Sequence, residues 1–487
     1  MFSIIVAADS KNGIGKNNDI PWNIPKDMKY FNDVTTDVTT DVTNHYLDAP
    51  GNKQNVVIMG RRTWESIPGK YRPLKDRINV IISRTMEPPK NEEYYICKTY
   101  SMAMNEWCMN KKKNINRVFL IGGAGLYFQG MRDSMCAMIY LTRIYGDFGC
   151  DRNIPEIDGT FKITSCENLQ TTKESGIDYR FIIYTRTRTH YDNVPEHEYL
   201  NLIRRTLKNG DERSDRTGTG TISTFGEKMV FNLEKDGFPI LTTKRVPFKM
   251  VIKELLWFLA GDTNNKHLQD QGVHIWDGNT SRDFLDKRGL QHYQEGDIGP
   301  TYGFQWRHFG AEYEGCDAEY SGKGVDQIKE VIRQIKEEPA SRRIIFTAWN
   351  PSALHGMVLP PCHSIVVQFY VRNGKDGNKK FLDCQMYQRS ADEFLGIPFN
   401  ITSYALLLQM ISQVTDLKPG KLIMVLGDSH IYKNHVEQVN EQLGREPRAF
   451  PVLNINKNVK DIDSFTLDDF ELLEYRPHLT IKAPMAI

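Results

Sequence analysis

The run at residues 359–364 places a single cysteine, Cys362, directly after two consecutive prolines. Because proline restricts the backbone, the thiol is held in a fixed position where a strand-like segment at residues 365–371 begins. A fixed thiol whose anion is stabilised by cationic side chains acts as a nucleophile in covalent catalysis. A buried thiol is also a common packing residue, so the other polar runs of the chain decide between the two interpretations.

Four arginines and one carboxylate are candidates to act with this thiol. Arginines that converge on one dianion bind phosphate through bidentate hydrogen bonds and lower the pKa of a nearby thiol, although scattered arginines are usually solvated. Glu254 lies in a predicted helix at residues 248–260 that is apolar almost all round, where an idle carboxylate would be costly to bury. The arginines are Arg216, Arg342, Arg343 and Arg389, and Ser390 follows the last of them.

Three further polar residues, Asn400, His430 and Tyr432, offer donors and acceptors that suit a pyrimidine and a sugar. Taken singly, each is equally compatible with a structural role. Only their combination with the thiol and the arginines carries weight.

A second carboxylate, Asp27, lies in the first turn of a predicted helix that begins near Pro25. Helical spacing places Asp27, Met28 and Phe31 on one face, so the carboxylate is expected among apolar neighbours. Desolvation there would raise its pKa and suit proton delivery to a heterocycle. An acid at a helix start also interacts favourably with the helix dipole, so spacing alone leaves both interpretations open.

Three turns that follow predicted strands carry glycine or arginine. Two of them, residues 60–64 and 121–127, open helices, and the third contains Ser83 and Arg84. Backbone amides at helix starts and arginine side chains bind phosphate, so together the turns predict a dinucleotide site that favours an extra 2′-phosphate. The residues concerned in the first two turns are Arg61, Arg62, Thr63, Gly122, Gly123, Ala124, Gly125, Leu126 and Tyr127.

The length of 487 residues is too great for one ordinary core and predicts two or three domains. A hydrophobic content of 40%, a charged content of 25% and a net charge of +1 show no overall bias toward nucleic acid or acidic membranes. Eight cysteines without a CxxC pair predict a reducing compartment, and neither a disulfide scaffold nor a metal site. No signal peptide or membrane-spanning stretch is apparent, so we expect a cytoplasmic protein.

Apolar periodicity divides the chain at the polar residues 188–195. Residues 1–187 alternate short strands with helices, which predicts an α/β domain, and residues 196–487 form a second domain with helices at 196–207 and 403–414. The Val, Thr and Asp repeat at residues 34–43 is expected to be an exposed loop insertion. The strands predicted in the first domain are residues 3–8, 55–59, 78–83, 94–96, 117–121, 138–143 and 179–185.

The first domain resembles the dihydrofolate reductase family over almost its whole length, through motifs at residues 13–17, 20–22, 57–60, 66–68, 72–74, 77–79 and 121–123. The resemblance implies a mixed sheet flanked by helices and hydride transfer from NADPH to dihydrofolate. It implies that Asp27, where vertebrate members have glutamate, helps protonate the pteridine, and that Arg77 binds the folate α-carboxylate. It further implies a substrate pocket of Trp22, Phe31, Ile67, Leu74, Ile121 and Thr142, and an NADPH site lined by Ala7, Ile14, Arg62, Thr63, Ser83, Arg84, Gly123, Ala124, Gly125 and Tyr127.

Residues 196–487 similarly resemble the thymidylate synthase family, through motifs at residues 215–220, 254–258, 299–307, 342–344, 359–363 and 387–390. The resemblance implies that Cys362 adds to C6 of dUMP, so that C5 captures the one-carbon unit of 5,10-methylenetetrahydrofolate. Glu254 would move protons through ordered water, and Asn400 would read the uracil edge. The implied ligands are Arg216, Arg389 and Ser390 for phosphate, His430 and Tyr432 for ribose, and Trp276, Asp392, Gly396 and Phe399 for folate, with Tyr302 and Gln388 also in the substrate site.

The neighbour of the thiol, His363, is expected to have only a supporting role, because consecutive strand residues point to opposite faces. In the thymidylate synthase family, arginines at the positions of Arg342 and Arg343 reach the phosphate of the neighbouring subunit. The resemblance therefore implies an α+β fold for the second domain and a homodimer formed through its large sheet.

The chain as a whole resembles the fused enzymes of the two families, in which the second domain makes dTMP and dihydrofolate and the first reduces the dihydrofolate. Two alternatives stay open. The reductase domain could be a silent scaffold, or the arginines could serve an RNA-binding regulator. No RNA-binding motif is present, so RNA binding is expected to be at most secondary.

Overall fold

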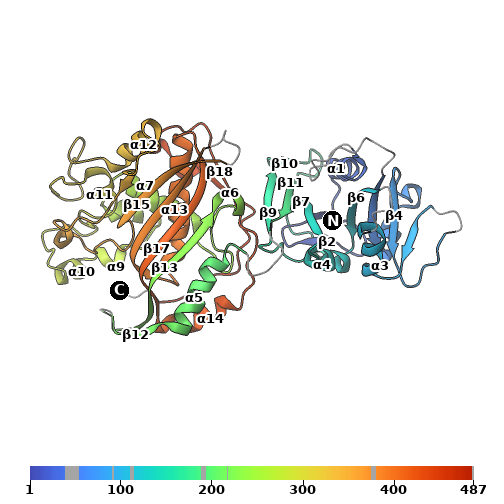
Figure 1. Ribbon diagram of the computed structural model, residues 1–487, viewed down its shortest axis with the longest axis horizontal. Helices are drawn as coiled ribbons and strands as arrows, with labels where there is room; N and C mark the ends of the chain where they lie inside the picture. The colour runs from blue at the N-terminus through green and yellow to red at the C-terminus, as the bar shows by residue number, and fades with distance from the viewer. Residues whose placement is uncertain are drawn as a thin grey trace. The chain divides into compact units, whose positions relative to one another are not determined.

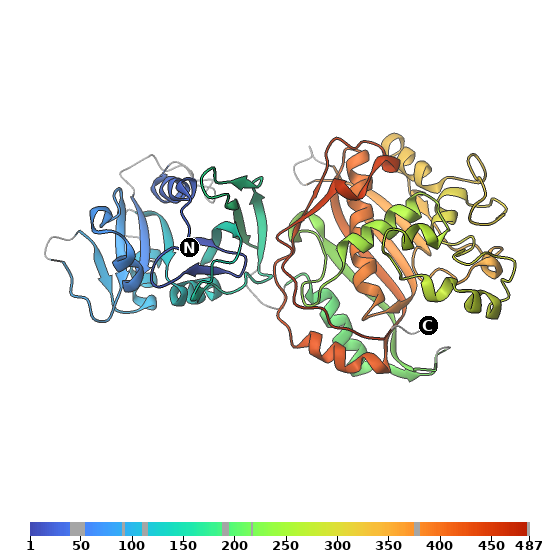
Figure 2. The ribbon, with the colours of Figure 1, turned by 180° about the vertical axis from the view of Figure 1, so that it is seen from behind.

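The computed structural model describes residues 1–38, 54–89, 93–109, 115–187, 194–215, 218–374 and 380–484. These residues fall into two compact units, Met1–Tyr191 and Asp192–Ile487, which Figures 1 and 2 show from opposite sides. Each unit has its own sheet and its own core.

The first unit is built on a nine-stranded mixed sheet in the order β10-β11-β7-β1-β6-β3-β4-β5, with β9 paired to β11. Neighbouring strands from β7 to β5 are parallel, and β11 is antiparallel to β7. The strands are β1 (Phe2–Ala8), β3 (Gln54–Gly60), β4 (Arg77–Ile82), β5 (Tyr95–Cys97), β6 (Ile115–Gly122), β7 (Cys136–Tyr145), β9 (Phe161–Cys166), β10 (Gln170–Thr171) and β11 (Asp178–Arg186), with β2 (Gly13–Gly15) and β8 (Arg152–Asn153) in a separate pair. The helices are α1 (Pro25–Thr36), α2 (Arg61–Ser66), α3 (Tyr100–Met104) and α4 (Ala124–Arg132), with a π-helical turn at Asn105–Met109 and a 3₁₀ turn at Gly69–Tyr71.

All seven strands predicted for this unit are present, with ends that differ by one or two residues. Four short strands were missed, and β9 is the most informative of them. In β9 only Phe161 and Ile163 are buried and the next residues are polar, so local hydrophobicity hardly marks it. Pairing with β11 makes this segment a strand.

Helix α1 differs from the sequence prediction at both ends. Met28 is 59% exposed, so it does not shield Asp27 as the spacing argument proposed. The interpretation of residues 34–43 as an exposed loop was wrong for the first three residues, which belong to α1, and Thr35 is fully buried. Residues 39–43 lie outside the described part of the chain.

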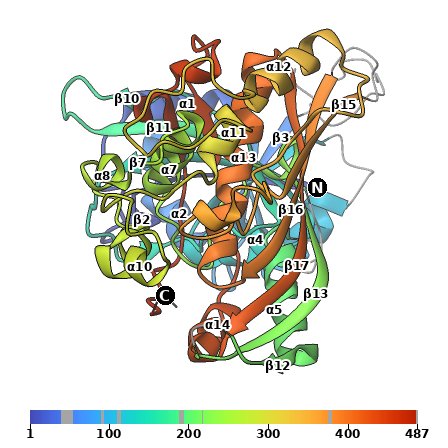
Figure 3. The ribbon, with the colours of Figure 1, turned by 90° about the vertical axis from the view of Figure 1, so that its left-hand side faces the viewer.

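The second unit is built on a six-stranded sheet in the order β12-β13-β17-β16-β15-β14, and Figure 3 shows β13, β15, β16 and β17 beside α13. Its strands are β12 (Asp211–Arg213), β13 (Thr221–Asn232), β14 (Ile345–Phe346), β15 (Val366–Asn373), β16 (Lys380–Asp392) and β17 (Lys418–Tyr432), with β18 (Val452–Ile455) and β19 (Phe470–Leu473) in a separate pair. Its helices are α5 (His197–Asn209), α6 (Leu233–Asp236), α7 (Phe248–Leu259), α8 (Asn265–Gln269), α9 (Asp277–Thr280), α10 (Arg282–Lys287), α11 (Gly303–His308), α12 (Gln327–Glu337), α13 (Gly396–Val414) and α14 (Val436–Leu443), with 3₁₀ turns at Leu354–Gly356, Lys433–His435, Ile462–Ser464 and Leu467–Asp469.

Helix α13 forms the centre of the second core and packs on β16 and β17. It begins at Gly396, seven residues before the predicted start, and contains Pro398 in its first turn. Proline is tolerated there because the first N–H groups of a helix have no partner within the helix. The earlier start places Asn400 on a rigid helix beside the end of β16.

No helix among the described residues combines the length and apolar composition that crossing a membrane requires.

Two candidate active sites

In the first unit, the carboxylate of Asp27 meets the sheet at Thr142. The Thr142 hydroxyl on β7 donates a hydrogen bond of 2.6 Å to Oδ1 of Asp27. Burial raises the pKa of Asp27, and the hydrogen bond from Thr142 opposes part of that increase. A carboxyl group of this kind retains a proton to a higher pH than an exposed aspartate does, which suits an acid beside a heterocycle.

The residues predicted to form the wall of this pocket are apolar and at least partly buried. Trp22 is buried against Phe148, with ring centroids 5.3 Å apart, and its Nε1–H has no hydrogen-bond partner among the described residues. A ligand or a water at this site would satisfy that donor. The predicted wall residues Phe31, Ile67, Leu74 and Ile121 are all partly buried against one apolar cluster of the sheet.

The guanidinium group of Arg77 is held by two residues of α1. It donates to the Thr35 hydroxyl at 2.6 Å and to Oδ1 of Asn32 at 3.1 Å. Burial lowers the pKa of Arg77, which Asp76 partly opposes. Sequence reasoning missed Asn32 and Thr35, although their three-residue spacing on a helix places them on one face.

The buried side chain of Asn55 fixes the end of α1. Its Nδ2 donates to the carbonyl oxygens of Thr35 and Asp37, each at 2.9 Å, and its Oδ1 accepts from Nδ2 of Asn116 at 2.9 Å. The residue that orients Arg77 is thus tied to the sheet through one amide.

The three predicted phosphate turns lie at one edge of the sheet, because they follow the adjacent parallel strands β6, β3 and β4. A Cβ on Gly60 would lie 3.8 Å from the nitrogen of Gly123, so the two glycine turns touch. Gly122 has φ +150°, and a Cβ on it would lie 2.8 Å from Thr63, whereas a Cβ on Gly125 would meet nothing within 4 Å. Glycine is thus required where the turns meet, and open space lies at the start of α4.

The basic residues of these turns differ in their contacts. Arg61 is engaged in an ion pair of 2.6 Å with Glu65 and donates to Thr85 at 2.8 Å. Arg62 and Arg84 are exposed, and their guanidinium groups form no hydrogen bond or ion pair with another described residue. The arrangement fits a phosphorylated dinucleotide such as NADPH, with Arg62 and Arg84 as the available cations. Ala7 lies at the carboxyl end of β1, in register with Thr142. Ile14 lies on β2, in the segment that follows β1.

In the second unit, the backbone around Cys362 is held on both sides. The Cys362 N–H donates to the hydroxyl of Tyr302 at 2.9 Å, and the Cys362 carbonyl accepts from the Arg389 N–H at 2.9 Å. The Arg389 guanidinium donates to the carbonyls of Pro361 and Pro360 at 2.8 and 3.0 Å. One of the four predicted arginines is therefore bound to the backbone of residues 360–362, and the thiol of Cys362 is half-buried.

The reason that the sequence offered for a supporting role of His363, the alternation of strand residues, was wrong. Both Cys362 and His363 precede β15, and Ser364 has φ 56°, so strand alternation does not apply to them. Nδ1 of His363 lies 2.8 Å from the hydroxyl of Tyr404, which also bonds Ser364. Burial lowers the pKa of His363 to about 3, so its imidazole is neutral and unsuited to act as a base for the thiol.

Glu254 is the second titratable group of this site. Its Oε1 accepts a hydrogen bond of 2.9 Å from the indole N–H of Trp276, whose ring centroid is 5.9 Å from that of Tyr302. Burial raises the pKa of Glu254 to about 7, which the bond from Trp276 partly opposes. A carboxyl group with this pKa can both give and take a proton near neutral pH.

The residues predicted to bind uracil and ribose belong to two separate groups of hydrogen-bonded side chains. Oδ1 of Asn400 accepts from Nε2 of Gln388 at 3.0 Å, and the same nitrogen donates to the carbonyl of Ser390 at 3.0 Å. Nδ1 of His430 lies 2.9 Å from Oδ1 of Asp428, which sequence reasoning missed although a two-residue spacing on a strand places both on one face. Burial lowers the pKa of His430, but Asp428 and nearby carboxylates raise it by more.

The other predicted residues of this site are distributed around these sets. Asp392 ends β16, Gly396 and Phe399 begin α13, and Tyr432 ends β17. Arg342 and Arg343 are exposed, and their guanidinium groups contact no other described residue by a hydrogen bond or ion pair. Arg216 lies outside the described residues.

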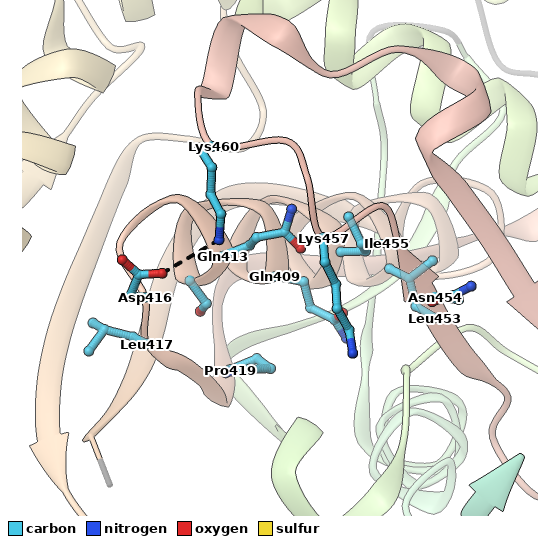
Figure 4. Close-up of a pocket in the computed structure, with 11 residues that line it drawn as sticks. Gln409, Gln413, Asp416, Leu417, Pro419, Leu453, Asn454, Ile455, Lys457 and Lys460 are labelled. Atoms are coloured by element: carbon cyan, nitrogen blue, oxygen red, sulfur yellow. Dashed lines mark ion pairs between the residues drawn. The ribbon is translucent and has the colours of Figure 1, made fainter.

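A separate surface pocket of about 440 Å³ lies at the end of α13 (Figure 4). Its lining includes Gln413, Asp416, Leu453 and Lys460, and Lys460 is 3.7 Å from Asp416. None of the predicted site residues lines it.

Comparison with known proteins identifies a family for each of the two units. The thymidylate synthase family matches residues 197–487, and the dihydrofolate reductase family matches residues 1–41 and 50–186. The bifunctional dihydrofolate reductase-thymidylate synthase 2 of Arabidopsis thaliana is 44% identical over 519 residues, which cover 100% of this chain and 88% of the relative. This chain belongs to the bifunctional dihydrofolate reductase-thymidylate synthase family.

Relatives from other lineages match over a similar extent. The bifunctional enzyme of Zea mays is 44% identical, covering 100% of this chain and 97% of the relative, and that of Leishmania major is 41% identical, covering 100% and 95%.

The chain is therefore an enzyme with two activities. It converts dUMP to dTMP with 5,10-methylenetetrahydrofolate, and it reduces the released dihydrofolate to tetrahydrofolate with NADPH. These results confirm the predicted fold class, both activities and both cosubstrates.

Proposed function

We propose that Cys362 and Glu254 carry the chemistry of dTMP formation. The thiolate adds to C6 of dUMP and breaks the C5–C6 double bond, which makes C5 the nucleophile for the one-carbon unit. Loss of the C5 proton and cleavage of the bond between the methylene carbon and the folate nitrogen leave an exocyclic methylene group on the ring. Hydride transfer from the released tetrahydrofolate to this methylene, with elimination of the thiolate from C6, gives dTMP and dihydrofolate. Glu254, with a pKa of about 7, exchanges the protons that these steps require at O4. The contact of Arg389 with Pro360 and Pro361 carries this proposal, because it binds a cation to the backbone that directly precedes Cys362.

Asn400, held by Gln388, is proposed to form hydrogen bonds with the polar edge of uracil. The 5′-phosphate is proposed to bind to Arg389, Ser390 and Arg216. His430 and Tyr432 hold the ribose 3′-hydroxyl. Folate contacts Trp276, Asp392, Gly396 and Phe399. The supporting observation is that β16, β17 and the start of α13, which carry most of these residues, converge at one end of the sheet.

In the reductase unit, Asp27 is proposed to hold the pteridine and to favour its protonation, with Thr142 setting its pKa. Arg77 binds the folate α-carboxylate. NADPH supplies the hydride, and Arg62 and Arg84, together with the turns at Thr63 and residues 122–127, hold its phosphates.

Replacing Cys362 by Ser and Asp27 by Asn in separate variants tests both assignments. Cys362→Ser should abolish dTMP formation and leave NADPH oxidation with dihydrofolate at its wild-type rate. Asp27→Asn should lower the reductase rate by at least about a hundredfold and spare dTMP formation. Mass spectrometry after incubation with 5-fluoro-dUMP and 5,10-methylenetetrahydrofolate should reveal a covalent adduct on Cys362, and its absence would contradict the proposed nucleophile.

We further propose a homodimer formed by the sheet of the second unit. One face of this sheet is covered by α13 and contains the buried side chains of Val367, Phe369 and Met386. On the opposite face, Tyr370 is 66% exposed and Val366 is 41% exposed.

This open face is continuous across several strands. Residues that lie on this face, by strand register and alternation, come from four strands. They are Ile345, Gln368, Tyr387, Ile423 and Val425. A broad apolar sheet face of this kind is typical of a surface that a second subunit covers. The exposed Arg342 and Arg343 precede β14 at its edge, where they would reach the phosphate in the partner's site.

Mixing two inactive variants tests the shared site. Cys362→Ser supplies intact arginines, and Arg343→Glu supplies an intact thiol, so hybrid dimers that form on mixing contain one complete site. We expect dTMP formation to return on mixing, whereas two arginine variants mixed together serve as the inactive control. A mixture that forms hybrids but stays inactive would exclude the sharing of arginines.

We also propose that residues 188–195 link the two domains, which the family matches ending at residue 186 and starting at residue 197 support. The eight thiols of the chain support a cytoplasmic location.

A further inference from the structure

Glu393 is a buried carboxyl group that the proposed mechanism does not use. It follows the last residue of β16, and its exposed fraction is 0%. Burying a carboxyl group is costly unless hydrogen bonds compensate it, so its contacts show what it holds.

Both the side chain and the backbone of Glu393 connect two neighbouring elements. Oε1 accepts a hydrogen bond of 2.5 Å from the Thr206 hydroxyl on α5 and one of 2.8 Å from the Ser429 hydroxyl on β17. The Glu393 N–H donates to the carbonyl of His430 at 2.9 Å, and its carbonyl accepts from the Tyr199 hydroxyl on α5 at 2.9 Å. The end of β17 is thus held against α5 through one residue.

The strands on either side of Glu393, β16 and β17, carry several of the proposed nucleotide ligands. Asp392 is in register with His430 in the parallel pair of β16 and β17. Oδ1 of Asp392 accepts from the N–H groups of Phe394 and Leu395 at 2.9 and 3.1 Å, and α13 begins at the next residue, Gly396. Glu393 therefore lies at the junction from which the phosphate, ribose and uracil ligands extend.

We infer that Glu393 is a positioning residue for dUMP binding, which sets the backbone of Ser429 and His430 so that the imidazole meets the ribose. The inference rests on the proposed role of His430. It assigns the effect to the acceptor Oε1, which lies within hydrogen-bond distance of both hydroxyls. Asp428 orients the imidazole itself at 2.9 Å, whereas Glu393 fixes the strand that carries it.

The charges around Glu393 make the conservative variant informative. The pKa of Glu393 is raised to about 7, chiefly by burial and also by the charge of Glu227. The hydrogen bonds from Thr206 and Ser429 and the charge of His430 oppose this increase. Oε2 has no hydrogen-bond partner among the described residues. A glutamine at this position keeps the acceptor Oε1 and removes the charge, so it separates the two properties.

The experiment measures dTMP formation at varied dUMP and saturating 5,10-methylenetetrahydrofolate. Glu393→Met, which keeps the volume and removes the acceptor, should raise KM for dUMP about tenfold with kcat nearly unchanged. Glu393→Gln should restore KM to within about twofold of the wild type. The reductase rate of the same chains normalises the protein concentration, and the preserved kcat shows that the site is folded.

A second background separates positioning from general packing. In His430→Asn, Glu393→Met should raise KM for dUMP no further, because the side chain it positions is gone. An unchanged KM in Glu393→Met alone, a loss confined to kcat, or an undiminished effect in the His430→Asn background would overturn the inference. If His430→Asn itself leaves KM unchanged, the proposed role of His430 fails instead, and the inference falls with it.

Discussion

The hydrogen bond between Thr142 and Asp27 leads to a quantitative prediction about the reductase. Replacing Thr142 by Val keeps the branched shape of the side chain and removes only the donor to Oδ1 of Asp27. Burial already raises the pKa of Asp27, and the bond of 2.6 Å opposes that increase by stabilising the carboxylate. Its removal therefore raises the pKa further.

The size of this change follows from the strength of the bond. A hydrogen bond to a charged group contributes about 1.5–3 kcal/mol, and one pKa unit corresponds to about 1.4 kcal/mol. The pKa of Asp27 is thus expected to rise by about one to two units in Thr142→Val. Because the acid then keeps its proton to higher pH, the fall of the hydride-transfer rate at alkaline pH should move upward by the same amount.

Stopped-flow measurement of single-turnover NADPH oxidation from about pH 5 to about pH 9 tests this prediction. Thr142→Ser retains a donor hydroxyl and should follow the wild-type profile more closely than Thr142→Val does. An alkaline limb that stays in place in Thr142→Val, or that moves to lower pH, would refute the assignment of this bond as the group that tunes Asp27.

Three further predictions concern stability, assembly and substrate affinity. Glu254 has a folded-state pKa of about 7. Its contribution to the free energy of unfolding is therefore complete below its unfolded pKa of about 4.3 and is lost as pH rises from there through 7, by about 4 kcal/mol. Glu254→Gln should flatten this fall in calorimetric unfolding of the second unit, and an identical slope in both proteins would contradict it. Tyr370→Asp places a charge on the open sheet face and should shift the protein from dimer to monomer in sedimentation velocity, at an unchanged reductase rate per chain; a variant that stays dimeric would exclude this face as the interface. Asn55→Ala removes the hydrogen bonds between the end of α1 and the sheet and should displace Arg77, so that KM for dihydrofolate rises about tenfold. The KM for NADPH is the internal control, and equal changes in both constants would indicate general destabilisation.

Local patterns were sufficient to predict much of this protein. The apolar runs of the first unit correspond to its central strands, because strands buried in a parallel sheet are hydrophobic along their length. The glycine turns after β3 and β6 were also predictable, since neighbouring parallel strands place their carboxyl ends at one edge. The residue types at Asp27, Cys362 and Glu254 indicated acid and nucleophile chemistry before any contact was known.

The remaining features depend on segments that are distant in sequence. Met28 is exposed and Thr35 buried because the sheet, and not the helix pattern, selects the covered side of α1. Several side chains of the two sites are held by residues from other elements, up to 187 residues away in sequence. Examples are the acceptors that hold Arg77, the tyrosine beside His363 and the hydroxyl groups that donate to Glu393. No local spacing encodes such contacts, since they form only when the packing of the core brings the elements together, and their hydrogen bonds then set the pKa and the orientation of the side chains on which the chemistry depends.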